Sequence, residues 1–395
     1  MVKKKVGGNM FDFNYAIPTD IHVGVGAEAK AGVLMAPYAK KVMMLYGSER
    51  IFRTGIGGII EDSLKDAGID VLRYGGVTPN GDTDFIDEAV KHARENGVDG
   101  LLAIGGGSVI DTAKAISAAV NYKEGNTVDL YTNPEAMPES FLPIGAVVTI
   151  PGTASESNPM SVVTNTATGI KLIRPFNEVK PKFAIMDPAL TTSVSPFQTA
   201  SGGFDMFAHA FERYFDMRRG SQVFDALTMA LMEKVVRLLP QVLADPENTD
   251  LRAEMMLASS VAHNDTLGPG GDFACHGISH TITKYSHLAH GAALAVVFPV
   301  WCRYVADMQL DYEHRQRLEK FFAGVFGAAD VEQGISKLTE FIKSIGLPDK
   351  MELDSVDMDA MVEDTMGGAE FIGGGFAALG ASDVRKILEN VTVVA

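Results

Sequence analysis

Short apolar segments alternate with amphipathic helical segments in the first third of this chain. Residues 41–46, 69–74 and 100–104 are short and apolar and end beside glycines, which is the pattern of buried strands. Residues 55–67 and 82–96 lie between them, have apolar residues at helical spacing and are each followed by a glycine. Strands separated by helices of this length form βαβ units with a parallel sheet.

The rest of the chain is dominated by long helical segments. The strand-like residues 183–186 and the turn at Asp187 and Pro188 come just before this change, and 395 residues are many for one core. We therefore expect an α/β dinucleotide-binding domain over residues 1–190 and an all-α domain over residues 191–395. The helices expected in the second domain cover residues 204–215, 221–239, 251–264 and 315–326.

The composition limits the partners and the location of the protein. A formal net charge of −16 repels nucleic acid and anionic membranes, so neither is an expected partner. No apolar run approaches the roughly 18 residues of a membrane span, and no apolar segment follows the basic first residues as in a secretory signal. The two cysteines, Cys275 and Cys302, exclude a disulfide scaffold and fit a reducing cytosol, so we expect a cytoplasmic protein.

A glycine triplet follows the third expected strand. Residues 105–108 read Gly-Gly-Gly-Ser, and the helical segment 109–120 comes next. Three glycines allow close approach of the backbone to a ligand and positive φ, and the free N–H groups of the helix start attract phosphate. Ser108 and Asp111 have the spacing of a capping box. The loop departs from the G-x-G-x-x-G pattern of ordinary dinucleotide sites, and a tight turn without a ligand is the alternative.

The end of the first expected strand bears on the choice of dinucleotide. Gly47 and Ser48 stand where an NAD-selective enzyme typically has an acid for the ribose 2′-OH, and Arg50 and Arg53 follow. Small residues and arginines would admit and pair with a 2′-phosphate. Two solvated arginines at the start of a helix are the alternative.

Histidines and one aspartate form a candidate metal site. Asp205 and His209 stand four residues apart in a helical segment, as do His276 and His280, and His290 precedes a glycine. An aspartate with three imidazoles is a workable ligand set for Fe²⁺ or Zn²⁺. Each histidine alone is better explained as a packed side chain, but their combination favours a divalent metal.

With these motifs the chain resembles the iron-containing (group III) alcohol dehydrogenases, and within them the NADPH-dependent butanol dehydrogenase and aldehyde reductase branch. The similarity covers nearly the whole chain. It includes residues 13–15, the GGGSVID run at 105–111, the run TIPGTASE at 149–156 and the metal motifs in order. The resemblance implies a fold like dehydroquinate synthase, with a parallel α/β domain and an all-α domain.

The resemblance also implies roles for individual residues. The metal ligands fall on Asp205, His209, His276 and His290, and the histidine facing the nicotinamide falls on His280, a candidate for proton relay. The cofactor-binding residues then are Gly47, Ser48, Gly105, Gly106, Gly107, Ser108, Asp111, Thr149, Thr153 and Lys171. Gly47 favours NADP(H) over NAD(H), although the acidic Glu49 is a departure, as is Ala154 in place of a usual glycine.

The implied activity is hydride transfer between NAD(P)H and a primary alcohol or aldehyde, catalysed by a homodimer that associates near Val23. Apolar residues near the metal motifs favour a small hydrophobic aldehyde, and they are Phe204, Phe207, Phe273, Ile278 and Leu288. A glycerol or diol dehydrogenase and a dehydroquinate synthase-like cyclase are alternatives. A non-catalytic metal-binding protein is a more distant one, because it would not need a phosphate-binding loop.

Overall fold

The computed structural model describes residues 16–353 and 355–394, which form two compact units. The first unit comprises Ile17–Met206 and Leu238–Asn264, and the second comprises Ala16 and the described residues of 207–237 and 265–395. The divisions fall inside helices α7 (Pro196–Tyr214) and α8 (Gln222–Ala244). The domain boundary near residue 190 therefore stays a prediction. Residues 13–15 of the family signature lie outside the described residues.

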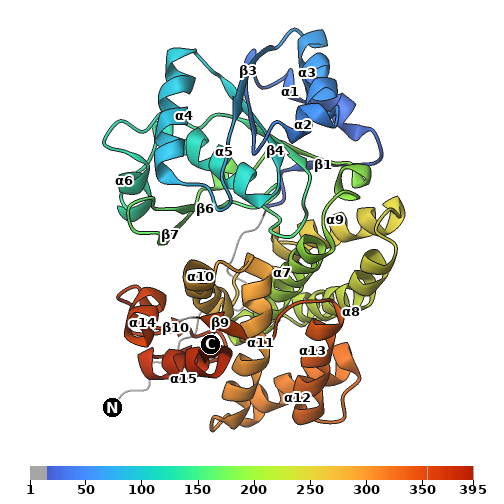
Figure 1. Cartoon of the computed structure of the whole chain (residues 1–395), viewed down its shortest axis with the longest axis vertical. Coiled ribbons are helices and arrows are strands. Elements are labelled where there is room, and N and C mark those ends of the chain that lie inside the picture. Colours follow the sequence, from blue (N-terminus) through green and yellow to red (C-terminus); the bar gives the residue numbers. More distant parts are fainter. Residues whose placement is uncertain (1–15, 354, 395) are drawn as a thin grey trace. The chain divides into compact units, whose positions relative to one another are not determined.

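A six-stranded sheet organises the first unit, with the strand order β1-β8-β5-β4-β2-β3 and only parallel pairings (Figure 1). The central strands β4, β5 and β8 are buried at every position, as expected where helices cover both faces of a parallel sheet. The strands are β1 (Asp20–Val23), β2 (Lys41–Tyr46), β3 (Asp70–Gly75), β4 (Gly100–Gly105), β5 (Ile144–Val148) and β8 (Phe183–Met186).

The helices of this unit follow the strands, and an antiparallel hairpin of β6 (Met160–Thr164) and β7 (Lys171–Pro175) is added. The α-helices are α1 (Ala31–Met35), α2 (Arg50–Arg53), α3 (Ile56–Asp66), α4 (Thr83–Glu95), α5 (Gly107–Ala119), α6 (Thr127–Thr132) and α9 (Thr249–His263). Short 3₁₀ helices are η1 (Ala27–Lys30), η2 (Asn177–Val179) and η3 (Pro188–Thr191).

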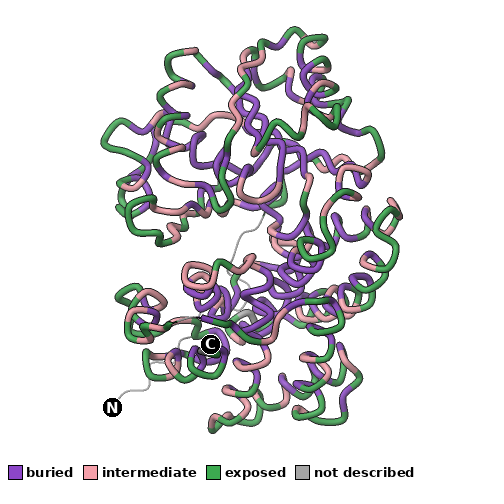
Figure 2. The backbone as a smooth tube through the Cα atoms, viewed as in Figure 1, coloured by how far each residue is buried: buried purple, intermediate pink, exposed green. Residues whose placement is uncertain are grey.

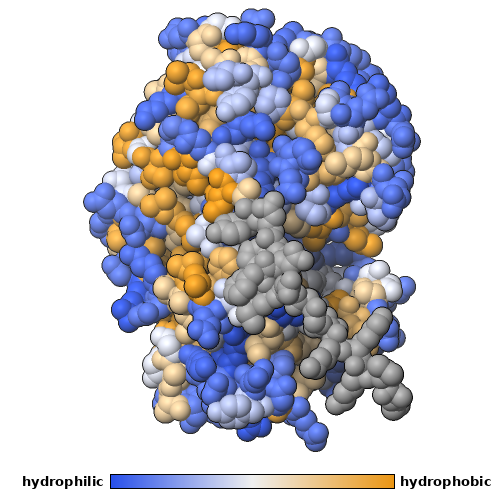
Figure 3. All heavy atoms as spheres, turned by 180° about the vertical axis from the view of Figure 1, so that it is seen from behind, coloured by the Kyte–Doolittle hydropathy of each residue, from blue (hydrophilic) through white to orange (hydrophobic). Residues whose placement is uncertain are grey.

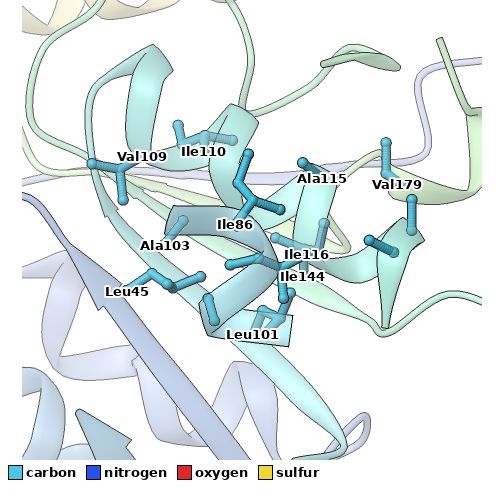
Figure 4. Close-up of a cluster of buried hydrophobic side chains, with 14 of the residues drawn as sticks. Leu45, Ile86, Leu101, Ala103, Val109, Ile110, Ala115, Ile116, Ile144 and Val179 are labelled. Atoms are coloured by element: carbon cyan, nitrogen blue, oxygen red, sulfur yellow. The ribbon is translucent and has the colours of Figure 1, made fainter. Parts of the chain in front are cut away.

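Alternation along the strands divides the core of this unit between the two faces of the sheet. Leu45, Leu101 and Ala103 pack with residues of α4 and α5, including Ile86 and Ile116 (Figure 4). Their strand neighbours join a second cluster with α1 and α3. This cluster includes Met35, Val42, Met44, Ile60, Leu64, Leu102 and Ile104. Buried residues accordingly run along the strands of the sheet in Figure 2. Because successive side chains of a strand point to opposite faces of the sheet, these almost entirely apolar strands contribute to an apolar layer on each face.

Helices dominate the second unit, as the sequence indicates, and two short two-stranded sheets accompany them. Beyond α7 and α8 these helices are η4 (Met217–Arg219), α10 (Ala274–Ser286), α11 (His290–Asp307), α12 (Tyr312–Phe326), α13 (Val331–Ser344), α14 (Met358–Met366) and α15 (Ala381–Val391). β9 (Met351–Leu353) pairs in parallel with β12 (Thr392–Val394), and β10 (Ile372–Gly373) pairs antiparallel with β11 (Ala378–Leu379).

An aromatic cluster fills the core of the second unit. Phe207 is fully buried, and its ring centroid lies 6.2–6.4 Å from five others. Those five rings belong to Phe211, Phe298, Phe321, Phe326 and Phe341. Phe207, one of the apolar residues near the metal motifs, thus belongs to the packed core of this unit.

The sequence placed the strands better than the helix starts. Residues 41–46 and 183–186 are strands as predicted, whereas α7 begins at Pro196 and not near residue 204. The sequence did not indicate the first turns of α7 because they contain Gly202 and Gly203, and glycine is a poor helix former. A Cβ at Gly202 would collide with the carbonyl oxygen of Pro151, and one at Gly203 would lie 2.5 Å from Leu239 Cδ1. Close packing thus explains both glycines.

The face of the molecule in Figure 3 mixes hydrophilic and hydrophobic residues. Within the described part of the chain, no helix combines the length and apolarity that crossing a membrane would require.

Candidate active site

Three of the predicted metal ligands come together in the structure. Asp205 and His209 lie one turn apart on α7, and His276 lies in the first turn of α10. One potential ligand atom from each lies within 4.8 Å of the others, and all three side chains are buried. The rings of His209 and His276 stack with centroids 4.6 Å apart. A buried carboxylate with two imidazoles fits Fe²⁺ or Zn²⁺.

The other two candidate histidines border this cluster. The ring of His290, the first residue of α11, lies 5.3 Å from that of His276. The ring of His280 lies 5.3 Å from that of His290, and both side chains are partly exposed. The compact group therefore comprises Asp205, His209 and His276, with His290 adjacent to it and His280 one ring further out.

Glu212 completes the surroundings of His276 and was missed by the sequence reasoning. Its Oε2 forms a short hydrogen bond with His276 Nδ1, and its Oε1 accepts the N–H of Cys275 at 2.7 Å. Glu212 is buried, so this pairing fixes the orientation of the His276 ring and leaves Nε2 as the nitrogen that could bind a metal. A signal existed, because Glu212 follows His209 by three residues and so shares its helix face.

The glycine loop joins β4 to α5 and is tightly packed. Gly106 caps α5, and its φ is −90°. A Cβ on Gly107 would lie 2.6 Å from Thr153 Oγ1, and one on Gly105 would collide with the Val109 side chain. None of the three glycines has a positive φ, so that part of the prediction is wrong. Close approach explains the triplet, and the first-turn N–H groups of α5 remain a suitable cradle for phosphate.

The predicted capping box is also wrong. Gly106 is the N-cap of α5 and has no side chain to accept a hydrogen bond. Ser108 Oγ instead accepts the N–H of Asn80 at 3.0 Å, and Asp111 Oδ1 accepts the hydroxyl of Ser155 at 2.5 Å. Burial raises the pKa of Asp111, and the Lys114 ammonium opposes that change. Both residues therefore bind neighbouring loops to the start of α5.

The turn that contains Thr149 and Thr153 lies against this loop. The N–H of Thr149 donates to the carbonyl of Gly105 at 2.9 Å. A Cβ at Gly152 would lie 3.1 Å from Gly202 Cα and 3.5 Å from Asp205 Oδ2. Glycines at 152 and 202 thus let the turn approach α7 where α7 carries the candidate metal ligand Asp205.

Lys171 begins β7 in the same unit. Burial lowers the pKa of Lys171 to about 8, and the carboxylates of Asp205 and Asp111 oppose that change. Its ammonium group therefore interacts electrostatically with Asp205, the candidate metal ligand, and with Asp111 on α5.

The end of β2 is open, as the sequence indicates. A Cβ at Gly47 would meet only the carbonyl oxygen of Val77, at 3.5 Å, and Ser48 is exposed. Arg50 and Arg53 are exposed on α2. Glu49, the acidic departure, accepts the Tyr46 hydroxyl at 2.7 Å. This hydrogen bond thus holds the Glu49 side chain beside the end of β2.

Comparison with known proteins gives matches over both parts of the chain. The family model of iron-containing alcohol dehydrogenases matches residues 18–188, and the C-terminal model of that family matches residues 199–392. The chain is 35% identical over 347 residues to the probable NADH-dependent butanol dehydrogenase 2 of Bacillus subtilis, which covers 87% of this chain and 88% of that protein. It is 32% identical over 369 residues to the NADPH-dependent aldehyde reductase YqhD of Escherichia coli, and the alignment covers 90% of this chain and 92% of that protein. The solved structure of NADH-dependent butanol dehydrogenase A from Thermotoga maritima has a TM-score of 0.89 at 30% identity, covering 97% of this chain and 99% of that one.

Proposed function

Since this chain belongs to the iron-containing alcohol dehydrogenase family, we propose that it reduces small apolar aldehydes with NADPH at a divalent cation. The family makes it an NAD(P)-dependent, metal-dependent alcohol dehydrogenase or aldehyde reductase. The proposal adds the site residues, the preferred cofactor and the substrate. The observation that carries it is the buried group of Asp205, His209 and His276, with ligand atoms within 4.8 Å of one another.

We propose that His290 completes the ligand set, because its ring neighbours that of His276. A bound cation would supply Lewis acidity to a substrate oxygen, and a bound nicotinamide would supply the hydride. Glu212 holds His276 in the orientation that presents Nε2. His280 is the candidate for proton exchange with solvent, since imidazole titrates near neutral pH. A role in orienting the ring of His290 is its alternative.

The backbone around α5 would bind the cofactor pyrophosphate. Gly106 and Gly107 place no side chain beside the first turn, and the helix dipole favours an anion there. We propose that Ser108, Asp111, Thr149 and Thr153 shape this site and that Lys171 adds positive charge. These residues would bind and orient the dinucleotide.

An aldehyde panel tests the proposed function. The purified protein is expected to oxidise NADPH with butanal and other apolar aldehydes, and elemental analysis is expected to find iron or zinc. Turnover that is confined to glycerol or diols would favour the polyol dehydrogenase alternative. The family match over both units disfavours a dehydroquinate synthase-like cyclase and a non-catalytic metal protein. A protein that lacks NAD(P)H turnover when loaded with either metal would contradict the proposal.

Gly47→Asp is expected to lower the preference for NADPH over NADH about tenfold. A carboxylate at the end of β2 would accept the ribose 2′-OH of NADH and repel a 2′-phosphate. The position has room for the side chain, because only the Val77 carbonyl lies near its Cβ. The measurement is the ratio of kcat/KM values for the two cofactors. Gly47→Asn is the matched control and should leave the ratio near its original value, and an unchanged ratio in both variants would remove the proposed role of Gly47.

Glu212→Gln is expected to weaken metal binding about tenfold, which is the lower end for a residue that orients a ligand. The amide keeps the shape of the side chain but loses the charge that pairs with His276 Nδ1. Metal affinity is measured by competition with a chelator. Glu233→Gln on α8 is a control, since Glu233 pairs with Arg237 on the same helix. Equal metal affinity in the Glu212 variant and the parent protein would contradict this role.

The oligomeric state and location are also proposals. β1 pairs only with β8 among the described strands, and the apolar side chain of Val23 on it is exposed, which supports a homodimer formed along this edge. Cys275 and Cys302 are free and buried, which is compatible with a cytoplasmic location.

A further inference from the structure

Lys114 is a buried cation that the proposed chemistry does not use. It lies on α5 in the first unit and is 0% exposed. Its ammonium group donates to Asn158 Oδ1 at 3.0 Å and to the Met160 carbonyl at 2.7 Å, and lies 3.7 Å from Asp111 Oδ1. Burying a charge is unfavourable unless partners compensate it, so this arrangement calls for an explanation.

A chain of contacts connects Lys114 to the cofactor loop. Asn158 accepts from Lys114 and donates through Nδ2 to the Thr153 carbonyl at 3.1 Å. The Thr153 side chain in turn occupies the space beside Gly107, where an added Cβ would lie 2.6 Å from Oγ1. Gly107 is the first residue of α5, where the pyrophosphate is proposed to bind. Two hydrogen bonds and one close packing contact thus join the ammonium to the phosphate cradle.

We propose that Lys114 is a positioning residue for the cofactor, which acts through Asn158 to hold the Thr153 turn against the first turn of α5. This rests on the proposed function, because it assumes that the pyrophosphate binds there. The contacts keep the turn at one distance from the N–H groups of the first turn. Cofactor binding then requires no rearrangement of the loop, and preorganisation of this kind increases affinity.

The charge of Lys114 has a second effect on an anionic ligand. The carboxyl groups of Asp111 and Glu156, both buried, oppose the lowering of the Lys114 pKa, whereas the charge of Lys180 adds to it. Burial raises the pKa of both carboxyls, and the ammonium opposes this in each case. The cation therefore offsets negative charge at the base of the helix whose start would bind phosphate.

Asn158→Leu tests the connection while leaving Lys114 and both carboxyls in place. It removes the bonds that Asn158 Oδ1 accepts from Lys114 and from the N–H of Met160, and the bond that Nδ2 donates to Thr153, but keeps the branching of the side chain. We expect the Kd for NADPH, measured by fluorescence titration without substrate, to rise about tenfold, the effect of one lost hydrogen-bonded link. Metal content and kcat at saturating NADPH should stay near those of the parent protein, whereas the unfolding temperature should fall because a buried ammonium loses one partner. Lys123→Met is the control, since Lys123 is exposed and pairs with Glu139 at the surface.

Lys114→Met tests the charge. Burial lowers the pKa of Lys114 to about 8, so the side chain is cationic below this pH and neutral above it. Burial also lowers the pKa of Lys171 to about 8, so the comparison is made in a Lys171→Met background. There the Kd for NADPH is expected to rise as pH increases through about 8, and adding Lys114→Met is expected to remove this step. A merely structural role would not predict a pH profile that the substitution abolishes.

The outcomes separate this inference from the function on which it rests. A parent-like NADPH affinity in Asn158→Leu overturns the positioning role, even if Lys114→Met does not fold. An equal loss of metal and NADPH binding also overturns it, because the effect would then be general. A parent protein that binds neither NADPH nor NADH contradicts the proposed function itself.

Discussion

His276→Ala is expected to abolish metal binding and to lower kcat by about a thousandfold or more. The imidazole is one of three buried ligand candidates on two helices, and a methyl group cannot replace Nε2. Lewis acidity contributes several kcal/mol to stabilising charge on a carbonyl oxygen, which corresponds to at least about three orders of magnitude in rate. Elemental analysis and steady-state turnover of NADPH with butanal measure the two effects.

A matched histidine distinguishes metal loss from general damage. His92 lies on α4 in the first unit, where its ring packs beside Tyr74, 5.4 Å between centroids. His92→Ala should keep its metal and its turnover. Asp205→Asn provides a second variant that preserves volume while removing the carboxylate. Near-normal activity in a metal-free His276→Ala protein would contradict the assigned role of the cluster.

The sequence could predict the local geometry of this cluster but not the meeting of its helices. Asp205 and His209 share a face because they stand four residues apart on one helix. No local sequence pattern indicates that α10 begins beside α7. That placement depends on Glu212, whose backbone carbonyl accepts the N–H of Asp272 at 2.9 Å and whose side chain accepts the N–H of Cys275. Such long-range bonds leave no periodic signal in a single sequence.

The errors at α5 have a related physical cause. Ser108 and Asp111 have capping spacing, but each makes a long-range bond instead, to Asn80 and Ser155 respectively. At the start of α5, tertiary contacts therefore determine the hydrogen bonds of these two side chains, and the local capping preference does not. The glycine triplet was placed correctly, but its reason lies in the neighbouring Val109 and Thr153 side chains and not in positive φ.

Gly107→Val is expected to raise the Kd for NADPH about a hundredfold. A side chain there would displace Thr153, because an added Cβ would lie 2.6 Å from Oγ1, 2.7 Å from Cγ2 and 3.1 Å from Cβ of that residue. No rotation of Thr153 removes all three contacts, so the turn itself must move away from the first turn of α5. Overpacking of this kind costs about 1–3 kcal/mol, and 2.8 kcal/mol is about a hundredfold in affinity. Fluorescence titration measures the Kd, and metal content should be retained.

Two further variants show whether crowding is the cause. Gly58→Val on α3 is the matched control, because nothing lies within 4 Å of a Cβ at that position, and it should bind NADPH normally. Since φ at Gly107 is not positive, alanine is conformationally permitted there, and its whole effect should come from Thr153. Thr153→Ala in a Gly107→Ala background removes Oγ1 and Cγ2, so it should recover part of the lost affinity. An additive loss in the double variant would instead mean that Thr153 contributes to binding independently of the space that Gly107 leaves.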